Sequence, residues 1–214
     1  KDLKNCTNKL LSKLGEGGSY KQAYIPNCSP EIWEDEGEFS DVFTKKDCNN
    51  SVILLGIDAP SKFNTEVEKQ NRLSNIKVFK YGQCGETEYG SLPRSRLRTS
   101  TFAKSRWSYK IEEKFDMELF DFNISLDRGY LYKYNSDEEL LFRQKIKNVF
   151  ENVKILHDMN YGHFDIKPEN IMMKFMNPKD HSLKTIEKIT LIDYGFTQSA
   201  PVRKNMGTRD FLDP

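Results

Sequence analysis

The run His163-Phe164-Asp165-Ile166-Lys167-Pro168-Glu169-Asn170 constrains this chain more than any other segment. It places a carboxylate, a lysine and an amide within eight residues, a set that can orient a hydroxyl, meet a phosphate and hold a metal ion. A second motif, Ile192-Asp193-Tyr194-Gly195-Phe196, puts Asp193 23 residues after Asn170. A single Asp or Asn is more often a turn residue, but both motifs in this order predict a phosphoryl-transfer site.

The two motifs resemble the catalytic loop and the metal-binding motif of the eukaryotic-type protein kinase family. The resemblance extends over nearly the whole chain and is most specific from residue 155 to 214. It implies an α+β, bilobal kinase-like fold, with a β-rich N-lobe over residues 1–115 and a mainly helical C-lobe over residues 116–214. Because the chain stops at the activation segment, we expect a shortened kinase or part of an excised domain.

The resemblance implies a role for each polar residue of the two motifs. Asp165 would orient the incoming hydroxyl as catalytic base, and Lys167, a mark of Ser/Thr kinases, would reach the transferred phosphate. Asn170 and Asp193 would hold Mg²⁺, which prefers oxygen ligands. The implied reaction transfers the γ-phosphoryl group of ATP to a Ser or Thr hydroxyl of a protein. Two other classes remain open: a pseudokinase that binds nucleotide as a scaffold, and a small-molecule phosphotransferase.

The activation segment matches the family at its end, but the catalytic loop departs from it. Gly207 to Pro214 resembles the family pattern G-T-x-x-(Y/F)-x-x-P. Phe164, however, stands where the family usually carries an Arg that meets a phosphate on the activation loop. We therefore expect activity that does not require a phosphate on Thr197 or Ser199.

A glycine-rich turn resembles the phosphate-binding loop of the same family. Glycine lets backbone N–H groups approach phosphates closely. Tyr20 breaks the G-x-G-x-x-G pattern, because it stands where the third glycine would be. The implied nucleotide contacts fall on five consecutive residues: Leu14, Gly15, Glu16, Gly17 and Gly18.

The lysine that the family carries on its third strand is missing from the best match, Val52-Ile53-Leu54-Leu55, which ends in leucine. Three alternatives stay open. Lys21 can substitute from the preceding strand, because residues 18–24 are similar to the corresponding stretch of the with-no-lysine kinases. Lys45 can serve if Val42-Phe43-Thr44-Lys45 is the third strand. In the third alternative no lysine serves and the protein is a pseudokinase.

The resemblance also implies the acidic partner of that lysine and the segment that binds adenine. A helix that begins near residue 66 would carry the partner, with Glu66 as the predicted residue and Glu68 as the alternative. A strand near residue 109 would lead into the hinge. There the backbone at Glu113 and Phe115 would bind the adenine ring.

Composition argues against several other classes of protein. Lys and Arg number 33 and Asp and Glu 32, so a net charge of +1 does not indicate nucleic acid or a membrane as a partner. No apolar run approaches the roughly 20 residues of a membrane helix. Residues 83–107 read as a basic insertion, which is a solvated loop, a site for an acidic partner or a target of autophosphorylation.

Four cysteines, Cys6, Cys28, Cys48 and Cys84, occur without a C-x-x-C pair or a histidine cluster, which argues against a zinc site. Their even number would allow two disulfides. We nevertheless expect four reduced thiols and an intracellular protein, cytoplasmic or nuclear.

Hydrophobic patterning predicts several short strands followed by a long helix. Apolar residues at helical spacing predict the longest helix over 137–159, and a shorter helix is compatible with 64–73. Residues 26–39 are polar, contain two prolines and read as a loop. Seven segments are predicted as strands: 10–14, 20–25, 52–57, 76–81, 109–112, 171–173 and 189–192.

Overall fold

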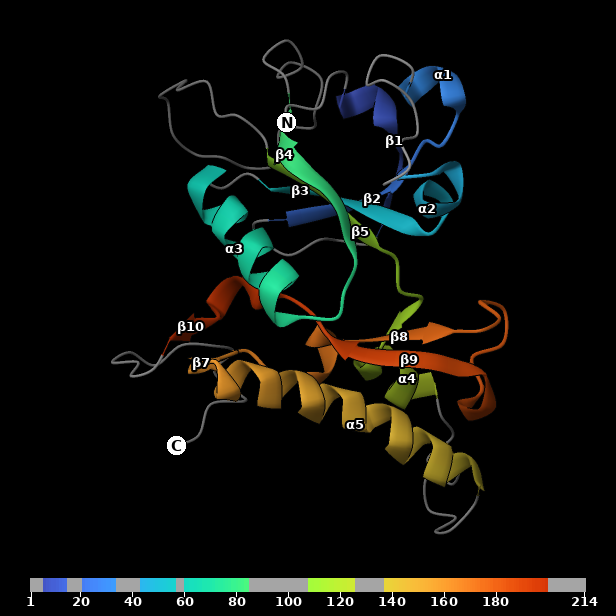
Figure 1. Cartoon of the computed structure of the whole chain (residues 1–214). Helices are drawn as coiled ribbons and strands as arrows, with labels where there is room; N and C mark the ends of the chain where they lie inside the picture. Colours follow the sequence, from blue (N-terminus) through green and yellow to red (C-terminus); the bar gives the residue numbers. More distant parts are fainter. Residues whose placement is uncertain are drawn as a thin grey trace. The chain divides into compact units, whose positions relative to one another are not determined.

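A computed structural model describes residues 6–14, 21–33, 43–56, 60–84, 108–125 and 137–199 of the chain (Figure 1). Within it the chain forms two compact units. Unit 1 contains residues 1–68 and 77–114, and unit 2 contains residues 69–76 and 115–214.

Unit 1 is built on a five-stranded antiparallel sheet with the strand order β1-β2-β3-β5-β4. The strands are β1 (Leu10–Leu14), β2 (Lys21–Pro26), β3 (Ser51–Gly56), β4 (Val78–Gln83) and β5 (Ser108–Glu113). Leu54 of β3 lies between Ala23 of β2 and Lys110 of β5. Because side chains alternate between the faces of a strand, this register determines which residues share a face.

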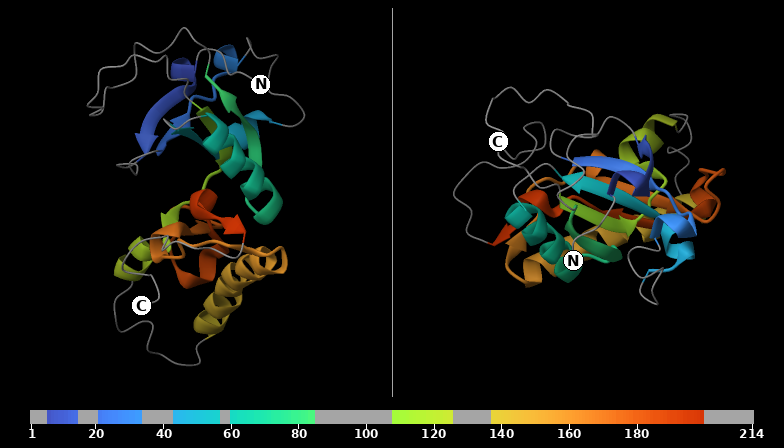
Figure 2. Two further views of the ribbon diagram at one scale, coloured as in Figure 1. Left: turned by 90° about the vertical axis from the view of Figure 1, so that its left-hand side faces the viewer. Right: turned by 90° about the horizontal axis from the view of Figure 1, so that it is seen from above.

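One face of the sheet carries the hydrophobic core of unit 1. Tyr24, Ile53, Leu55, Tyr109 and Ile111 are buried there in one cluster, and Trp33 and Phe43 belong to the same cluster. The short helices α1 (Pro30–Trp33) and α2 (Lys45–Asn49) each add a buried residue to this core. The opposite face meets helix α3 (Pro60–Leu73), whose Phe63 ring lies so close to Gly56 that a Cβ there would approach it to 2.6 Å. Figure 2 shows α3 lying along the sheet.

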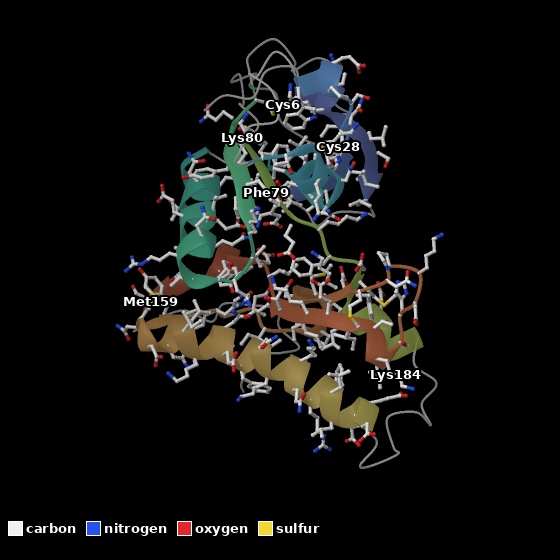
Figure 3. The ribbon with its side chains drawn as sticks, turned by 45° about the vertical axis from the view of Figure 1, so that its right-hand side comes forward. Cys6, Cys28, Phe79, Lys80, Met159 and Lys184 are labelled. Carbon is white, nitrogen blue, oxygen red and sulfur yellow. A yellow bond between two sulfur atoms is a disulfide. The ribbon has the colours of Figure 1, made fainter. Side chains whose placement is uncertain are left out.

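Two disulfides join the periphery of this sheet (Figure 3). Cys6, which begins a 3-10 helix, is bonded to Cys84 just beyond β4, and Cys28 is bonded to Cys48 in α2. The expectation of four reduced thiols is therefore wrong. The sequence separations of 78 and 20 residues do not reveal that the fold brings the Cα atoms to 5.8 and 5.9 Å. An intracellular location stays a prediction, but reduced cysteines no longer support it.

In its described residues, unit 2 contains a three-stranded antiparallel sheet, β6-β8-β9, together with α-helices. Its elements are β6 (Met117–Glu118), α4 (Leu119–Ser125), α5 (Asp137–Asp158), β7 (Tyr161–Gly162), β8 (Ile171–Phe175), β9 (Ile186–Leu191) and β10 (Gln198–Ser199). Strand β7 pairs with β10 in a separate two-stranded ladder. Helix α5 packs along β9, and Val149 lies in a core with Phe122, Met173 and Ile189.

The predicted α+β class, with strands early in the chain and the long helix later, is confirmed. Every segment predicted as a strand contains one, and the long helix spans Asp137–Asp158. Three local predictions are wrong. Helix α1 interrupts the expected loop over 26–39, Lys45 begins α2 instead of ending a third strand, and the expected basic insertion cannot begin at 83, because Gln83 ends β4.

The rest of the expected insertion, residues 85–107, lies outside the described residues. So do Gly15, Glu16, Gly17 and Gly18 of the glycine-rich turn, and the segment from Gly207 to Pro214. In the described part of the chain, no helix combines the length and the apolar character that crossing a membrane requires.

Candidate active site

The predicted catalytic loop follows β7 and is anchored by a buried histidine. His163 is 2% exposed, and its Nε2 lies 3.0 Å from the carbonyl oxygen of Ile192. Its Nδ1 accepts a hydrogen bond from the backbone N–H of Asp165 at 3.3 Å. These two contacts require the neutral tautomer that carries its proton on Nε2. Burial lowers the pKa of His163 below its usual value of 6.5, which favours the same neutral form.

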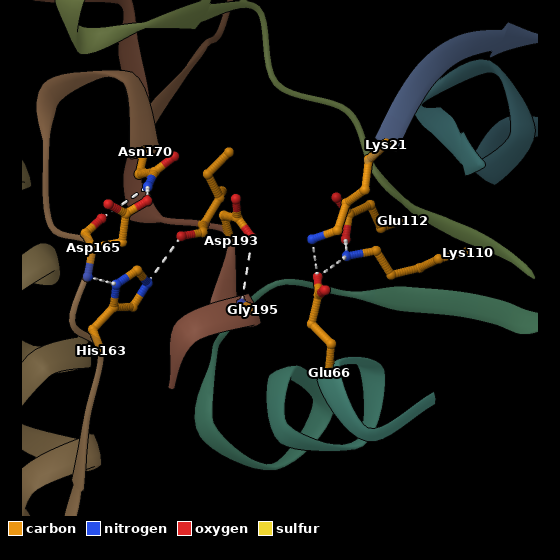
Figure 4. Close-up of polar contacts among 10 residues, drawn as sticks. Lys21, Glu66, Lys110, Glu112, His163, Asp165, Asn170, Asp193 and Gly195 are labelled. Carbon is orange, nitrogen blue, oxygen red and sulfur yellow. Dashed lines mark hydrogen bonds and ion pairs between the residues drawn. The ribbon is translucent and has the colours of Figure 1, made fainter. Parts of the chain in front are cut away.

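Asp165 and Asn170 form a buried hydrogen-bonded pair inside this loop (Figure 4). The Nδ2 amide of Asn170 donates to the Asp165 carboxylate and to the Asp165 backbone carbonyl, both at 2.8 Å. Each residue is 6% exposed. The Nζ of Lys167 lies 3.3 Å from the same carboxylate oxygen of Asp165 and is more accessible. The loop thus holds one carboxylate between an amide and an ammonium group.

Asp193 is the second residue after β9 and has a strained backbone. Its φ of 58° and ψ of 74° fall in the left-handed region, which is uncommon for a residue other than glycine. Its carboxylate accepts a hydrogen bond from the N–H of Gly195 at 3.3 Å. The N–H of Ile192 donates to the carbonyl of Asn170 at 2.8 Å, so the backbone joins the two predicted metal-binding segments. Figure 4 shows Asp165, Asn170 and Asp193 on neighbouring segments.

The oxygen donors of Asn170 and Asp193 suit a magnesium ion. The side-chain amide N–H of Asn170 donates to Asp165. The side-chain carbonyl oxygen of Asn170 is therefore the atom that can coordinate a cation. Asp193 supplies carboxylate oxygens, and Mg²⁺ is usually bound by one or two carboxylates together with substrate phosphates and water. Within the described ranges, no group of three or more His, Cys, Asp or Glu side chains could hold a metal, so a closed all-protein cage is not found there.

Phe164, the departure from the family pattern, packs back onto β7. It also has a positive φ, 61°, and its ring lies where a Cβ on Gly162 would approach it to 2.5 Å. Thr197 is fully buried, and Lys69 of α3 donates to its carbonyl oxygen at 2.6 Å. Phosphorylation of Thr197 would need this segment to open, whereas Ser199 is exposed. The expectation that activity needs neither phosphate stays a prediction.

In unit 1, the nucleotide-site prediction with the closest geometric support is the pair of Lys21 and Glu66. The Nζ of Lys21 in β2 lies 2.6 Å from Oε1 of Glu66 in α3. Glu66 is 8% exposed, whereas the alternative, Glu68, is exposed. Lys45 is also exposed, at the start of α2, so the alternative that put it on a third strand is wrong.

The register of β3 with its neighbours changes which residue of this strand stands where the expected third-strand lysine is missing. The best match to the family's third strand ends at Leu55, but Leu55 is 1% exposed in the core on the face opposite α3. Leu54 lies on the face that also carries Lys21, since Ala23 and Lys21 alternate with Gln22 along β2. Leu54, rather than Leu55, is therefore the position of β3 at which the expected lysine is missing.

Sequence reasoning missed two charged residues of this face, Lys110 and Glu112. The Nζ of Lys110 lies 2.9 Å from Glu112 and 3.8 Å from Glu66. The period-two alternation of Lys110 and Glu112 in a strand was a usable signal, because both then point to the face opposite Tyr109 and Ile111. This alternation does not predict that the Lys110 side chain is buried, with only 3% of it exposed.

The remaining residues predicted to bind the nucleotide are less defined by their contacts. Leu14 ends β1 and is half-buried, and Glu113 ends β5, where its N–H donates to the carbonyl of Lys77 at 2.9 Å. Phe115 belongs to unit 2, where the Nζ of Lys188 lies 5.5 Å from the centre of its ring. Nucleotide binding by these residues stays a prediction.

Known proteins similar to this chain are protein kinases. A putative serine/threonine-protein kinase, 040L, of Invertebrate iridescent virus 3 is 24% identical over 204 residues, which cover 90% of this chain and 51% of that protein. Calcium-dependent protein kinase 4 of Plasmodium berghei (strain Anka) is 29% identical over 118 residues, or 53% of this chain and 20% of that protein. The chain is related to the eukaryotic-type serine/threonine protein kinases.

Another protein kinase is similar to part of this chain. Death-associated protein kinase 2 of Homo sapiens is 32% identical over 95 residues, which cover 40% of this chain and 24% of that protein. No protein-family profile matches the chain. The chain spans about half the length of the viral relative and less of the other kinases. The relationship to protein kinases and the α+β fold are thus established.

Proposed function

We propose that this chain is a Ser/Thr protein kinase that transfers the γ-phosphoryl group of Mg-ATP to a protein hydroxyl. The observation that carries the proposal is the buried pair of Asp165 and Asn170 together with the half-buried Lys167, since Asn170 and Lys167 both contact one carboxylate oxygen of Asp165. Phosphoryl transfer needs little covalent chemistry from the protein, and depends on positioning and on charge near the phosphates. This group supplies a fixed acceptor for the hydroxyl and a cation beside it.

Each residue then has one task in the proposed reaction. Asp165 accepts the proton of the substrate hydroxyl, whose oxygen forms the new bond to phosphorus as the bond to the ADP oxygen breaks. Lys167 stabilises negative charge on the transferred group. Asn170 and Asp193 would hold Mg²⁺, which neutralises charge on the ATP phosphates when it is bound.

The nucleotide-binding residues of the proposal lie in unit 1 and at Phe115. Lys21, held by Glu66, would bind ATP phosphates, together with the backbone from Leu14 to Gly18. The backbone at Glu113 and Phe115 would bind adenine. An acidic partner for residues 83–107 remains a separate prediction that depends on a segment outside the described residues.

The test is transfer of labelled phosphate from Mg-ATP to a generic basic protein and to the chain itself. Wild type is compared with Asp193→Ala, Lys21→Ala and the matched control Lys45→Ala, which removes an exposed lysine of the same unit. We expect Asp193→Ala and Lys21→Ala to lose at least about 100-fold in rate, and Lys45→Ala to keep the wild-type rate. Circular dichroism of each variant without nucleotide checks that it is folded.

The alternatives give different results in the same experiment. A pseudokinase would show thermal stabilisation by Mg-ATP without transfer to any acceptor. A small-molecule phosphotransferase would transfer phosphate to small hydroxyl or amine compounds but to no protein. Wild type that neither transfers phosphate nor is stabilised by Mg-ATP would refute the proposal.

A further inference from the structure

Two lysines, rather than one, approach the carboxylate of Glu66. Figure 4 shows the amino groups of Lys21 and Lys110 both directed at it, from β2 and from β5. The distances to Oε1 of Glu66 are 2.6 Å for Lys21 and 3.8 Å for Lys110. Lys110 also lies 2.9 Å from Oε2 of Glu112. The four side chains form an alternating row of positive and negative charge inside unit 1.

The strand register explains why the second lysine can reach this carboxylate. Leu54 carries no charge at the position where a third-strand lysine would face α3, and Lys110 is its direct neighbour on β5. Cβ atoms of such neighbours lie about 4.5–5.5 Å apart. A lysine side chain on β5 can therefore place its ammonium group beside Leu54, although it comes from the neighbouring strand.

The two lysines differ in exposure, which indicates different tasks. The side chain of Lys110 is 3% exposed and that of Lys21 is 26% exposed. A buried ammonium group is tolerated only when it is paired, and Lys110 meets two carboxylates. Lys110 is thus placed as a fixed charge, while Lys21 has access to solvent and to a dissolved phosphate.

We propose that Lys110 is a positioning residue that holds Glu66 in place when Lys21 turns to the phosphates of the nucleotide. Glu66 then keeps a cationic partner throughout, and Glu112 anchors Lys110. This inference rests on the proposed kinase function. In this arrangement Lys21 and Lys110 share the role that a single third-strand lysine has in the protein kinase family.

The first test removes the buried pair as a unit. Lys110→Met with Glu112→Leu deletes both charges at similar volume, a change that is often neutral or stabilising for the fold, whereas removal of one partner alone is costly. We expect this double variant to melt near the wild-type temperature and to transfer phosphate at least about tenfold more slowly at saturating Mg-ATP. Lys77→Met, which removes an exposed lysine paired with Asp47 in the same unit, should keep the wild-type rate.

Two additional variants separate positioning from a structural role. In a chain that already carries Lys21→Ala, the double change should lower the remaining activity less than about twofold, because both act through Glu66. Adding Leu54→Lys to the double variant should restore a substantial part of the rate, since the new lysine faces the same carboxylate. A purely structural role would not be restored by a lysine on another strand.

One measurement needs no substitution and covers the case of a variant that fails to fold. Amine acetylation of wild type, followed by mass spectrometry, should modify Lys21, with protection by Mg-ATP, and should leave Lys110 unmodified with and without nucleotide. Reaction of Lys110 that Mg-ATP suppresses would make it a direct phosphate ligand and overturn the positioning role.

The failures can be told apart. Active wild type with a folded double variant of unchanged rate would overturn only the role of Lys110. Additive losses in the Lys21→Ala background would do the same. Wild type that shows neither transfer nor stabilisation by Mg-ATP would overturn the kinase proposal and, with it, this inference.

Discussion

Strained backbone is concentrated beside the proposed catalytic carboxylates. Among the described residues, three other than glycine have a positive φ: Asn160, Phe164 and Asp193. Phe164 precedes Asp165, and Asp193 is itself a proposed magnesium ligand. Such conformations cost about 1–3 kcal/mol each and persist only where the surrounding structure enforces them. The hydrogen bonds of His163 to Asp165 and to Ile192 provide that enforcement here.

The neutral state of His163 predicts how stability changes with pH. Its pKa in the folded protein is lowered from 6.5, chiefly by burial, so the unfolded chain takes up the proton first. The contribution of His163 is therefore fully present above about pH 6.5 and is lost as the pH falls towards the lowered pKa. We expect His163→Gln to cost about 1–3 kcal/mol at pH 7.5, and to cost less at pH 5.

Urea unfolding of wild type and His163→Gln at the two pH values measures this difference. His157→Gln is the matched control, because His157 lies exposed in the last turn of α5. A gap between wild type and His163→Gln that is equal at both pH values, or wider at pH 5, would contradict a buried neutral histidine.

At the level of elements, the short ladder of β7 and β10 precedes the proposed catalytic loop and positions its start. Gly162 pairs with Gln198, and Tyr161 pairs with Ser199. The Phe164 ring covers Gly162 so closely that any side chain there must displace it. A contact between two neighbouring residues thus sets the direction in which the chain enters the loop at Asp165.

This contact predicts the effect of a single methyl group. A Cβ at Gly162 would lie 2.5 Å from the Phe164 ring, so Gly162→Ala should destabilise the protein by about 1–3 kcal/mol through overpacking and should lower phosphate transfer. Adding Phe164→Leu removes the ring edge and should recover a large part of both. Thermal unfolding and the transfer assay measure the two effects. Equal stability of Gly162→Ala and wild type would refute this account of the contact.

Across the whole molecule, the covalent cross-links are confined to one unit. All four cysteines of the chain lie in unit 1, where Cys6–Cys84 ties the first described residues to the end of β4 and Cys28–Cys48 ties the loop after β2 to α2. Unit 2 is held by its apolar core, without a cross-link. Unit 1 should therefore depend on the redox state of its surroundings.

Thiol counting tests this directly. Alkylation of the denatured chain without reductant should modify none of the four cysteines, and alkylation after reduction should modify all four. Cross-links that close loops of 20 and 78 residues contribute about 3 and about 4.5 kcal/mol in the chain-entropy estimate. Paired alanine replacement of Cys28 and Cys48 should therefore cost less than replacement of Cys6 and Cys84. Four free thiols in the unreduced chain would contradict the disulfides and would support the original expectation of reduced cysteines in an intracellular protein.

Local sequence was sufficient to bring the polar residues of the proposed catalytic loop together and to predict the long helix. Asp165, Lys167 and Asn170 lie within six residues, so one loop brings them together whatever the rest of the chain does. The apolar spacing over 137–159 likewise predicts a helix, because an α-helix repeats every 3.6 residues and needs only its own pattern to be recognised.

Contacts between distant segments had to come from the folded arrangement of the strands. Lys21 and Lys110 both approach the carboxylate of Glu66 because the antiparallel register of β2, β3 and β5 puts them on the face that meets α3. Cys6 meets Cys84 because the fold brings the 3-10 helix before β1 to the end of β4. A shift of one residue in that register would reverse the face of every side chain, and local pattern does not report register across long separations. The residues of the proposed catalytic loop could thus be found along the chain, whereas the contacts of Lys21 and Lys110 and the cross-links depend on how distant segments fold together.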